Sequence, residues 1–183
     1  MRVVGRIREK KRDVGEPSYS LTIGLGVLKN AGRFETFLEK AVELGVSKVI
    51  PIATERVVRK SINRARCERV MIAGLKQSMR SRLPELTGVV DLLSFLRADD
   101  VGLKLVAHEG APSSSSLITQ AEPIRVSEKC AILIGPEGGF SERELESAVS
   151  LGWAPVSLGA SRLRAETAAI TVAGVIHMIK SRE

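Results

Sequence analysis

Two glycine-containing turns in the last third of the chain hold the residues best suited to bind a ligand. The first turn follows the apolar run 130–134 and contains Gly135, Pro136, Glu137, Gly138 and Gly139. Because glycine lacks a Cβ, this turn can adopt positive φ and bring its backbone amides and carbonyls close to a bound molecule. Ser141 and Glu144 have the spacing of a capping box, which predicts that a helix begins directly after the turn.

The second turn lies around Gly159, in the run 157–169, which also has the pattern of a strand, a turn and a helix start. Two such turns on neighbouring strands would converge on one crevice, and this indicates a pocket more strongly than either turn alone. The pocket is not of a common nucleotide-binding type. The sequence lacks G-x-G-x-x-G, and the first turn lacks the lysine of a phosphate-binding loop.

Alternating strands and helices are expected to position these turns. Apolar runs predict strands at 21–28, 46–53, 103–107, 130–134 and 155–158, and helical spacing predicts helices at 34–44, 61–81, 145–151 and 166–182. In the second helix the core candidates are Ile62, Val70, Ala73, Leu75 and Met79. This alternation favours an α/β fold with a mostly parallel sheet, helices on both faces and ligands at the carboxyl ends of the strands.

The composition excludes several classes of protein. Aromatic residues make up only 3% of the 183 residues, so binding of single strands by stacked aromatic side chains is not expected. Two cysteines and two histidines are too few for a disulfide framework or a zinc site, and no apolar run reaches membrane-spanning length. We expect a protein of the reducing cytoplasm that binds neither a metal nor a membrane.

The net charge of +7 is concentrated in one segment. Residues 56–82 contain nine basic residues and one acidic residue, and residues 2–12 are basic as well. Clustered positive charge beside a nearly neutral remainder is typical of a surface that binds RNA or DNA phosphates. The alternative is a solvated helix face and an exposed tail, since many charge runs are no more than that.

Four blocks in the same order resemble one known family. The glycine turn with its helix start has the form GPEGGFSxxE, and residues 158–168 have the form LG…LRxETA. Upstream, residues 39–46 are similar to an EKATELGV segment, and residues 77–86 to a QSxR…PEI segment. Over residues 20–180 the chain resembles the RsmE-type 16S ribosomal RNA methyltransferases of the SPOUT superfamily.

The resemblance implies S-adenosylmethionine-dependent methylation of N3 of a uridine in 16S rRNA, either free or in the small ribosomal subunit. It implies a homodimer and a SPOUT fold with a C-terminal trefoil knot. It also implies which residues line the cofactor pocket: Leu105, Ala107, His108, Ile134, Gly135, Pro136, Glu137, Gly138, Gly139, Leu158, Gly159, Leu163 and Arg164. RNA contacts are expected from Arg56, Arg59, Lys60, Arg64, Gln77, Arg80 and Arg82.

Two residues of the second turn are the catalytic candidates. Uridine N3 is a poor nucleophile until its proton leaves, so the site needs donors that stabilise the resulting negative charge. Arg164 is the first candidate for this role, and Glu166 could accept the proton or orient Arg164. Structural roles stay open: Arg164 could pair with Glu166 or Glu137, Glu166 could stabilise a helix N-terminus, and Glu137 could bind amides of its own turn.

The chain departs from the family pattern at two places. The family carries an N-terminal PUA-like RNA-binding domain, whereas we expect residues 1–19 to be a basic remnant of it and residues 20–183 to be the SPOUT domain. In addition, Ser161 stands where the family has an arginine, and Arg162 where it has an aliphatic residue. The alternative function is therefore a catalytically weak or inactive RNA-binding relative. A third reading is a small-molecule or nucleotide-binding protein whose basic helix is only solvated.

Overall fold

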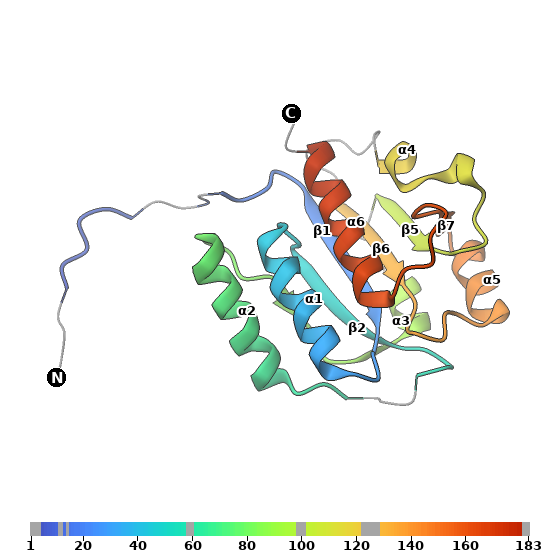
Figure 1. The fold of residues 1–183 in the computed structure, drawn as a ribbon, viewed down its shortest axis with the longest axis horizontal. Coiled ribbons are helices and arrows are strands. Elements are labelled where there is room, and N and C mark those ends of the chain that lie inside the picture. The colour runs from blue at the N-terminus through green and yellow to red at the C-terminus, as the bar shows by residue number, and fades with distance from the viewer. Residues whose placement is uncertain are drawn as a thin grey trace.

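A parallel β-sheet forms the centre of the fold in the computed structural model (Figure 1). The structure describes residues 5–10, 13, 15–57, 61–97, 102–121 and 129–180. Its strands run in the order β3-β2-β1-β6-β5-β7, and β4 also pairs with β2. All of the described pairs are parallel, so their carboxyl ends meet at one edge. The strands are β1 (Ser20–Gly26), β2 (Lys48–Ala53), β3 (Glu85–Leu86), β4 (Val90–Asp91), β5 (Leu103–Ala107), β6 (Lys129–Ile134) and β7 (Ala154–Val156).

Helices cover both faces of the sheet, as the sequence predicts. One face carries α1 (Ala31–Glu43), α2 (Arg64–Ser78), α4 (Leu117–Ala121) and α6 (Ala165–Lys180), and these helices share one hydrophobic cluster with the sheet. The other face carries α3 (Leu92–Leu96) and α5 (Glu142–Ser150), with Trp153 in a second cluster. A 3₁₀ turn at Ser113–Ser115 precedes α4.

The central strand β6 shows why the sheet needs both helical layers. Ile132 and Ile134 belong to the cluster under α1 and α6, whereas Ala131 and Leu133 belong to the cluster under α3 and α5. Successive side chains of a strand point to opposite faces, so a run of apolar residues without polar ones must be covered on both sides. The uninterrupted apolar pattern is therefore the sequence signal for a buried parallel strand.

The structure corrects the expected limits and buried face of α2. Asn63 caps the helix by accepting a hydrogen bond from the Arg66 amide, and Met79 ends it with a φ of +55°. The residues of α2 that are buried are Cys67, Met71 and Gly74. The predicted core residues Ile62 and Leu75 pack partly buried against the same cluster, whereas Ala73 and Met79 are exposed. The short elements β3, β4 and α4 were not predicted.

An ion pair attaches the N-terminal segment to the end of α2. Residues 5–10 form no helix or strand and extend away from the body (Figure 1). The Glu16 side chain is only 3% exposed, and it accepts hydrogen bonds from the Arg80 guanidinium and from the amides of Ser81 and Arg82. Arg80, whose side chain is 7% exposed, also donates to the Val42 carbonyl. Arg80 is thus engaged within the fold, and its contact with RNA stays a prediction.

Glu16→Gln tests whether this ion pair stabilises the fold. Burial acts to raise the pKa of Glu16, but hydrogen bonds from Arg82, Ser81 and Arg80 outweigh it and hold the pKa below its ordinary value of 4.5. The ionised form is thus favoured in the folded state, and its contribution is present above that ordinary value and lost as the pH falls through the folded pKa. We expect the variant to lose about 2 kcal/mol of unfolding free energy at pH 7, because charged hydrogen bonds contribute on that order.

Urea unfolding at pH 7 and pH 4 measures the difference between the two proteins. The gap between wild type and Glu16→Gln should shrink at pH 4. Glu85→Gln is the matched control, because Glu85 pairs with Lys48 on the exposed surface, where an ion pair contributes little. A gap that is unchanged between the two pH values, or no larger than that of the control, would contradict the assignment.

Candidate active site

A cavity of about 520 Å³ opens at the carboxyl ends of β5, β6 and β7. This volume lies within the range of pockets that hold small molecules, roughly 300–1,000 Å³. Segments that follow the three strands line it, together with two arginines from elsewhere in the chain. The lining residues are Arg33, Arg56, Ala107, His108, Glu109, Ile134, Gly135, Pro136, Glu137, Gly138, Gly139, Phe140, Leu158, Gly159, Ser161, Arg162, Leu163, Arg164, Ala165 and Ala168.

The first glycine turn forms one wall of this cavity. Gly139 has a φ of +67°, and its amide donates a 2.9 Å hydrogen bond to the Pro136 carbonyl. A Cβ on Gly135 would lie 3.2 Å from the Gly139 Cα, so the turn folds closely on itself. The predicted capping box is confirmed: Ser141 Oγ accepts from the Glu144 amide, and the Glu144 carboxylate accepts from the Ser141 amide. The start of α5 therefore fixes where the turn ends.

The second turn lies beside the end of β5 and forms the opposite wall. Gly159 has a φ of +110°, a backbone conformation that other residues rarely adopt. Backbone hydrogen bonds hold the entry to the turn, because the Ser157 amide donates to Ser115 and the Ser157 carbonyl accepts from Leu117. The two turns thus meet at one cavity, as the sequence predicts.

The loop after β2 also contacts the first turn and the helix that follows it. The Arg56 guanidinium donates a 2.7 Å hydrogen bond to the Gly138 carbonyl, and the Glu55 amide donates to Glu144 Oε1 at 2.7 Å. Glu144 therefore both caps α5 and binds this loop. Arg56, which the sequence analysis assigned to RNA contact, lines the cavity and supports the wall of the pocket.

Arg33 and two carboxylates form a charged cluster beside the cavity. Glu137 accepts hydrogen bonds from the Lys29 amide at 3.1 and 3.4 Å and lies 4.0 Å from Arg33 Nη1. Glu166, in the first turn of α6, lies 3.6 Å from Arg33 Nε. Glu166 is buried and does not line the cavity. The structure thus pairs Glu166 with Arg33 instead of with Arg164, which corrects the expected orientation of Arg164 by this carboxylate.

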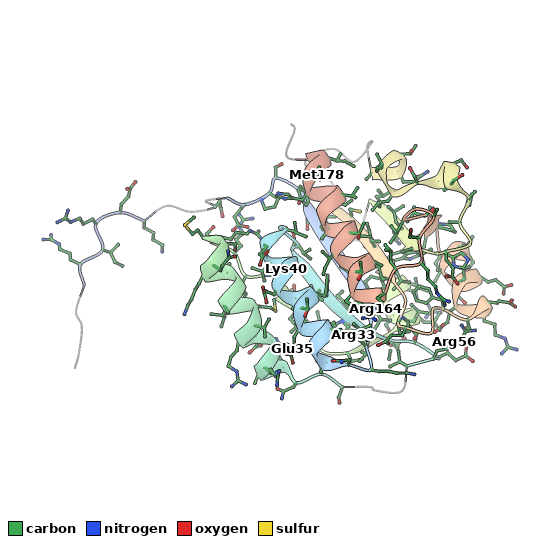
Figure 2. All side chains as sticks on the ribbon, in the orientation of Figure 1. Arg33, Glu35, Lys40, Arg56, Arg164 and Met178 are labelled. Carbon is green, nitrogen blue, oxygen red and sulfur yellow. The ribbon has the colours of Figure 1, made fainter. Side chains whose placement is uncertain are left out.

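Arg164 differs from the other three arginines of the cavity, of which Arg162 lies 3.5 Å from Glu109. Figure 2 shows Arg33, Arg56 and Arg164 on the same side of the molecule, and all three line the cavity. Within the described part of the chain, no carboxylate lies within 4.0 Å of Arg164. Its side chain is exposed at the start of α6, so its guanidinium is available to a ligand. The open alternatives that paired Arg164 with Glu137 or Glu166 are not observed.

The structure gathers the predicted pocket residues with one exception. Ala107, His108, Ile134, Leu158, Leu163 and the residues of both turns line the cavity, whereas Leu105 is fully buried in the core under the sheet. Leu105 lies two residues before the end of β5, so the periodicity of the strand directs it to the core. Leu105 therefore does not line the cavity, and its contact with a cofactor stays a prediction. The part that each lining residue plays in binding stays a prediction.

The predicted RNA-binding residues divide into several groups. Arg64 and Gln77 are exposed on α2. Arg82 is exposed but paired with Asp13 at 2.6 Å, and Arg80 is buried. Arg59 and Lys60 lie outside the described residues. Of these residues, Arg64 and Gln77 are thus the exposed ones on α2, and Arg64 lies 2.8 Å from Glu68.

Sequence reasoning missed Arg33 and Phe140 among the residues of the cavity. Arg33 lies in the first turn of α1, which follows the carboxyl end of β1 directly. The rule that ligands meet the carboxyl ends of parallel strands, applied to this strand as well, would have identified it. Phe140 directly follows the last glycine of the first turn.

The described residues contain neither a helix suited to cross a membrane nor a cluster suited to hold a metal ion. None of the described helices has both the length and the apolar character that a membrane crossing requires. The described histidine, cysteine, aspartate and glutamate side chains form no group of three or more that could hold a metal ion.

Known proteins resemble this chain over most of its length. A ribosomal RNA small subunit methyltransferase E from Mesomycoplasma hyopneumoniae is 31% identical over 90% of this chain and 72% of its own. A crystal structure of a probable rRNA-methyltransferase from Porphyromonas gingivalis has a TM-score of 0.81 and 32% identity, over 99% of this chain and 74% of that one. A ribosomal RNA small subunit methyltransferase E from Neisseria gonorrhoeae, bound to S-adenosyl methionine, has a TM-score of 0.78 and 27% identity, over 89% and 67% of the two chains.

The chain is shorter than these relatives. It spans 72%, 66% and 54% of the length of three curated relatives that bear the same name. The family model that matches describes an RNA methyltransferase domain, and it covers residues 15–177, which include the whole cavity. The fold, the meeting of the two turns and this match agree, and the chain belongs to the RNA methyltransferase domain family, as its resemblance to the SPOUT enzymes predicts.

Proposed function

We propose that this chain binds S-adenosylmethionine in the cavity between the two turns and methylates N3 of a uridine in 16S rRNA. The observation that carries the proposal is the convergence of both glycine turns on one cavity of about 520 Å³, whose wall holds an arginine, Arg164, with no ion pair among the described residues. The names of the Mesomycoplasma and Neisseria relatives, and the cofactor bound in the latter, support the same activity.

The residues of the cavity fit this cofactor. The backbone of 135–139 and of 158–163 presents amides and carbonyls, and the first turn is folded so closely that a Cβ on Gly135 would lie 3.2 Å from the Gly139 Cα. Ile134, Leu158 and Leu163 provide apolar surface for a flat ring. When bound, the cofactor supplies an electrophilic methyl group on a sulfonium. The protein contributes mainly by positioning, since only interactions that strengthen in the transition state accelerate the transfer.

Arg164 is the proposed catalytic residue. Removal of the N3 proton spreads negative charge over the two carbonyl oxygens of the uracil, and a guanidinium can donate hydrogen bonds to such an anion. Arg33 lies between two carboxylates, and Arg56 donates to Gly138. Arg162 lies 3.5 Å from Glu109, so among the described residues Arg164 is the lining arginine without such a partner. Burial raises the pKa of the Cys67 thiol and raises that of Cys130 to about 12, which argues against a thiolate nucleophile.

The outer side of α2 is the proposed RNA-binding surface. Arg64, Arg69, Lys76 and Gln77 are exposed along this helix. Arg64 forms an ion pair with Glu68, whereas Arg69 and Lys76 have no ion pair among the described residues. The trefoil knot, the homodimer and the division of the chain at residues 19 and 20 stay predictions of the family resemblance.

Arg164→Ala tests the catalytic assignment. The variant should lose methyl transfer to 16S rRNA by at least about a hundredfold, because removal of one donor to a developing oxyanion costs on that order. Its affinity for S-adenosylmethionine should stay within about threefold, since backbone atoms are proposed to hold the cofactor. Labelled methyl transfer and isothermal titration calorimetry measure the two quantities. Arg143→Ala, an exposed position on α5 outside the cavity, is the control for lost surface charge.

The same assays separate the alternative functions. An equal loss of transfer and cofactor affinity in Arg164→Ala would make Arg164 a pocket residue only. Wild-type protein that binds the cofactor but methylates neither bare 16S rRNA nor small subunits would favour the catalytically weak relative. Wild-type protein that does not bind the cofactor at saturating concentration would contradict the proposal and favour a different small-molecule ligand.

A salt titration tests the RNA-binding surface. The logarithm of the RNA affinity should fall linearly with the logarithm of the salt concentration, and Arg69→Gln and Lys76→Gln should each reduce the slope by about one. Fluorescence anisotropy with labelled 16S rRNA fragments measures both slopes. The control Arg143→Gln should leave the slope unchanged. If the α2 variants keep the wild-type slope, RNA does not bind along this helix.

A further inference from the structure

Arg33 joins three elements that surround the cavity, and neither the catalytic nor the RNA-binding assignment uses it. It lies in the first turn of α1, and its guanidinium reaches Glu137 in the first glycine turn and Glu166 in the first turn of α6. Figure 2 shows Arg33 near Arg164, beside the start of α6. One cation therefore faces two carboxylates, each from a different wall of the pocket.

The burial of Glu166 makes this contact important. The residue is 8% exposed, and its Oε2 atom is buried without a hydrogen-bond partner. Within the described part of the chain, Arg33 is the cation at ion-pair distance from this carboxylate. A buried charge that loses its partner is strongly destabilising, whereas removal of both charges together is often tolerated. The start of α6, which carries Arg164, therefore depends on Arg33 for its charge balance.

Glu137 links the same cation to the wall of the pocket. Its carboxylate accepts hydrogen bonds from the Lys29 amide and lies at the N-terminus of α1, where the helix dipole favours negative charge. Arg33 is one turn of helix away and approaches the same carboxylate at 4.0 Å. The backbone of the glycine turn is thus held against α1 through one side chain, at the point where the turn lines the cavity.

We infer that Arg33 is a positioning residue that sets the spacing between the glycine turn and the start of α6, and so the affinity for the methyl donor. This inference rests on the proposed function, because the ligand is the proposed cofactor. Arg33 acts through Glu137 and Glu166 and makes no contact with the transferred group. Its loss should therefore raise KM for the cofactor and leave kcat at saturation nearly unchanged.

A set of variants of the full chain tests the inference with S-adenosylmethionine as the probe. Arg33→Gln should raise Kd and KM for the cofactor by about tenfold, with kcat within about threefold, because a fixed charge partner of a buried carboxylate is lost. Arg33→Lys keeps the positive charge but replaces the planar guanidinium by an ammonium group. It should weaken cofactor binding by no more than about threefold. Lys48→Gln is the matched control: Lys48 is 36% exposed against 34% for Arg33, and it pairs with Glu85 away from the cavity.

The double variant Arg33→Gln with Glu166→Gln tests whether Arg33 affects cofactor affinity through Glu166. The double variant should bind the cofactor more tightly than Arg33→Gln alone, because the unpaired buried charge of Glu166 is then absent. The effects of the two substitutions on cofactor affinity should therefore be strongly non-additive. If Arg33→Gln does not fold, the double variant should fold and bind. The inference is overturned if Arg33→Gln binds like wild type, if Arg33→Lys is as weak as Arg33→Gln, or if the double variant is no better than the single one.

The outcome for wild-type protein separates this inference from the proposed function. Wild-type chain that fails to bind the methyl donor contradicts the proposed function itself. Wild-type chain that binds the donor, together with Arg33 variants that bind it equally well, contradicts the positioning role alone.

Discussion

The close approach of the first glycine turn to the end of β1 determines the geometry of the cavity. A Cβ on Gly26 would lie 2.5 Å from the Pro136 nitrogen, so the turn can lie against the strand only because Gly26 has no side chain. The parallel pairing of β1 with β6 places these two segments side by side. Because cores are close-packed, even a methyl group here would move the backbone that lines the pocket.

Other elements hold the turn through side chains that reach it from a distance in sequence. Arg56 binds Gly138 from the loop after β2, and Glu137 binds the Lys29 amide at the start of α1. Both contacts join the first third of the chain to its last third. They are local in space and distant in sequence, so the pocket exists only where the sheet has brought these segments together. The binding site is thus a consequence of the whole fold.

The sequence predicts the backbone framework of the site better than its charges. The apolar runs predict the strands, and the capping box between Ser141 and Glu144 is local, so both follow from short-range chemistry. Pairing partners are not local: Arg80 binds Glu16, and Glu166 lies beside Arg33. No pattern within either segment indicates these partners.

The error in α2 has a related cause. Its buried face uses the small residues Cys67 and Gly74, which allow α1 to approach closely, and a Cβ on Gly74 would lie 3.2 Å from the Glu39 carbonyl oxygen. An assignment based on apolar side chains finds the partly buried Leu75 but misses these two small residues. Small residues are recognised as buried only when the neighbouring helix is known.

A crystal structure of this chain with S-adenosylmethionine tests the central claim most directly. The account predicts the cofactor between the backbone of 135–139 and that of 158–163, with Arg164 facing the methyl group across the open side of the cavity. A cofactor bound at another place on the chain, or held mainly by side chains while the two turns stay apart, would contradict it.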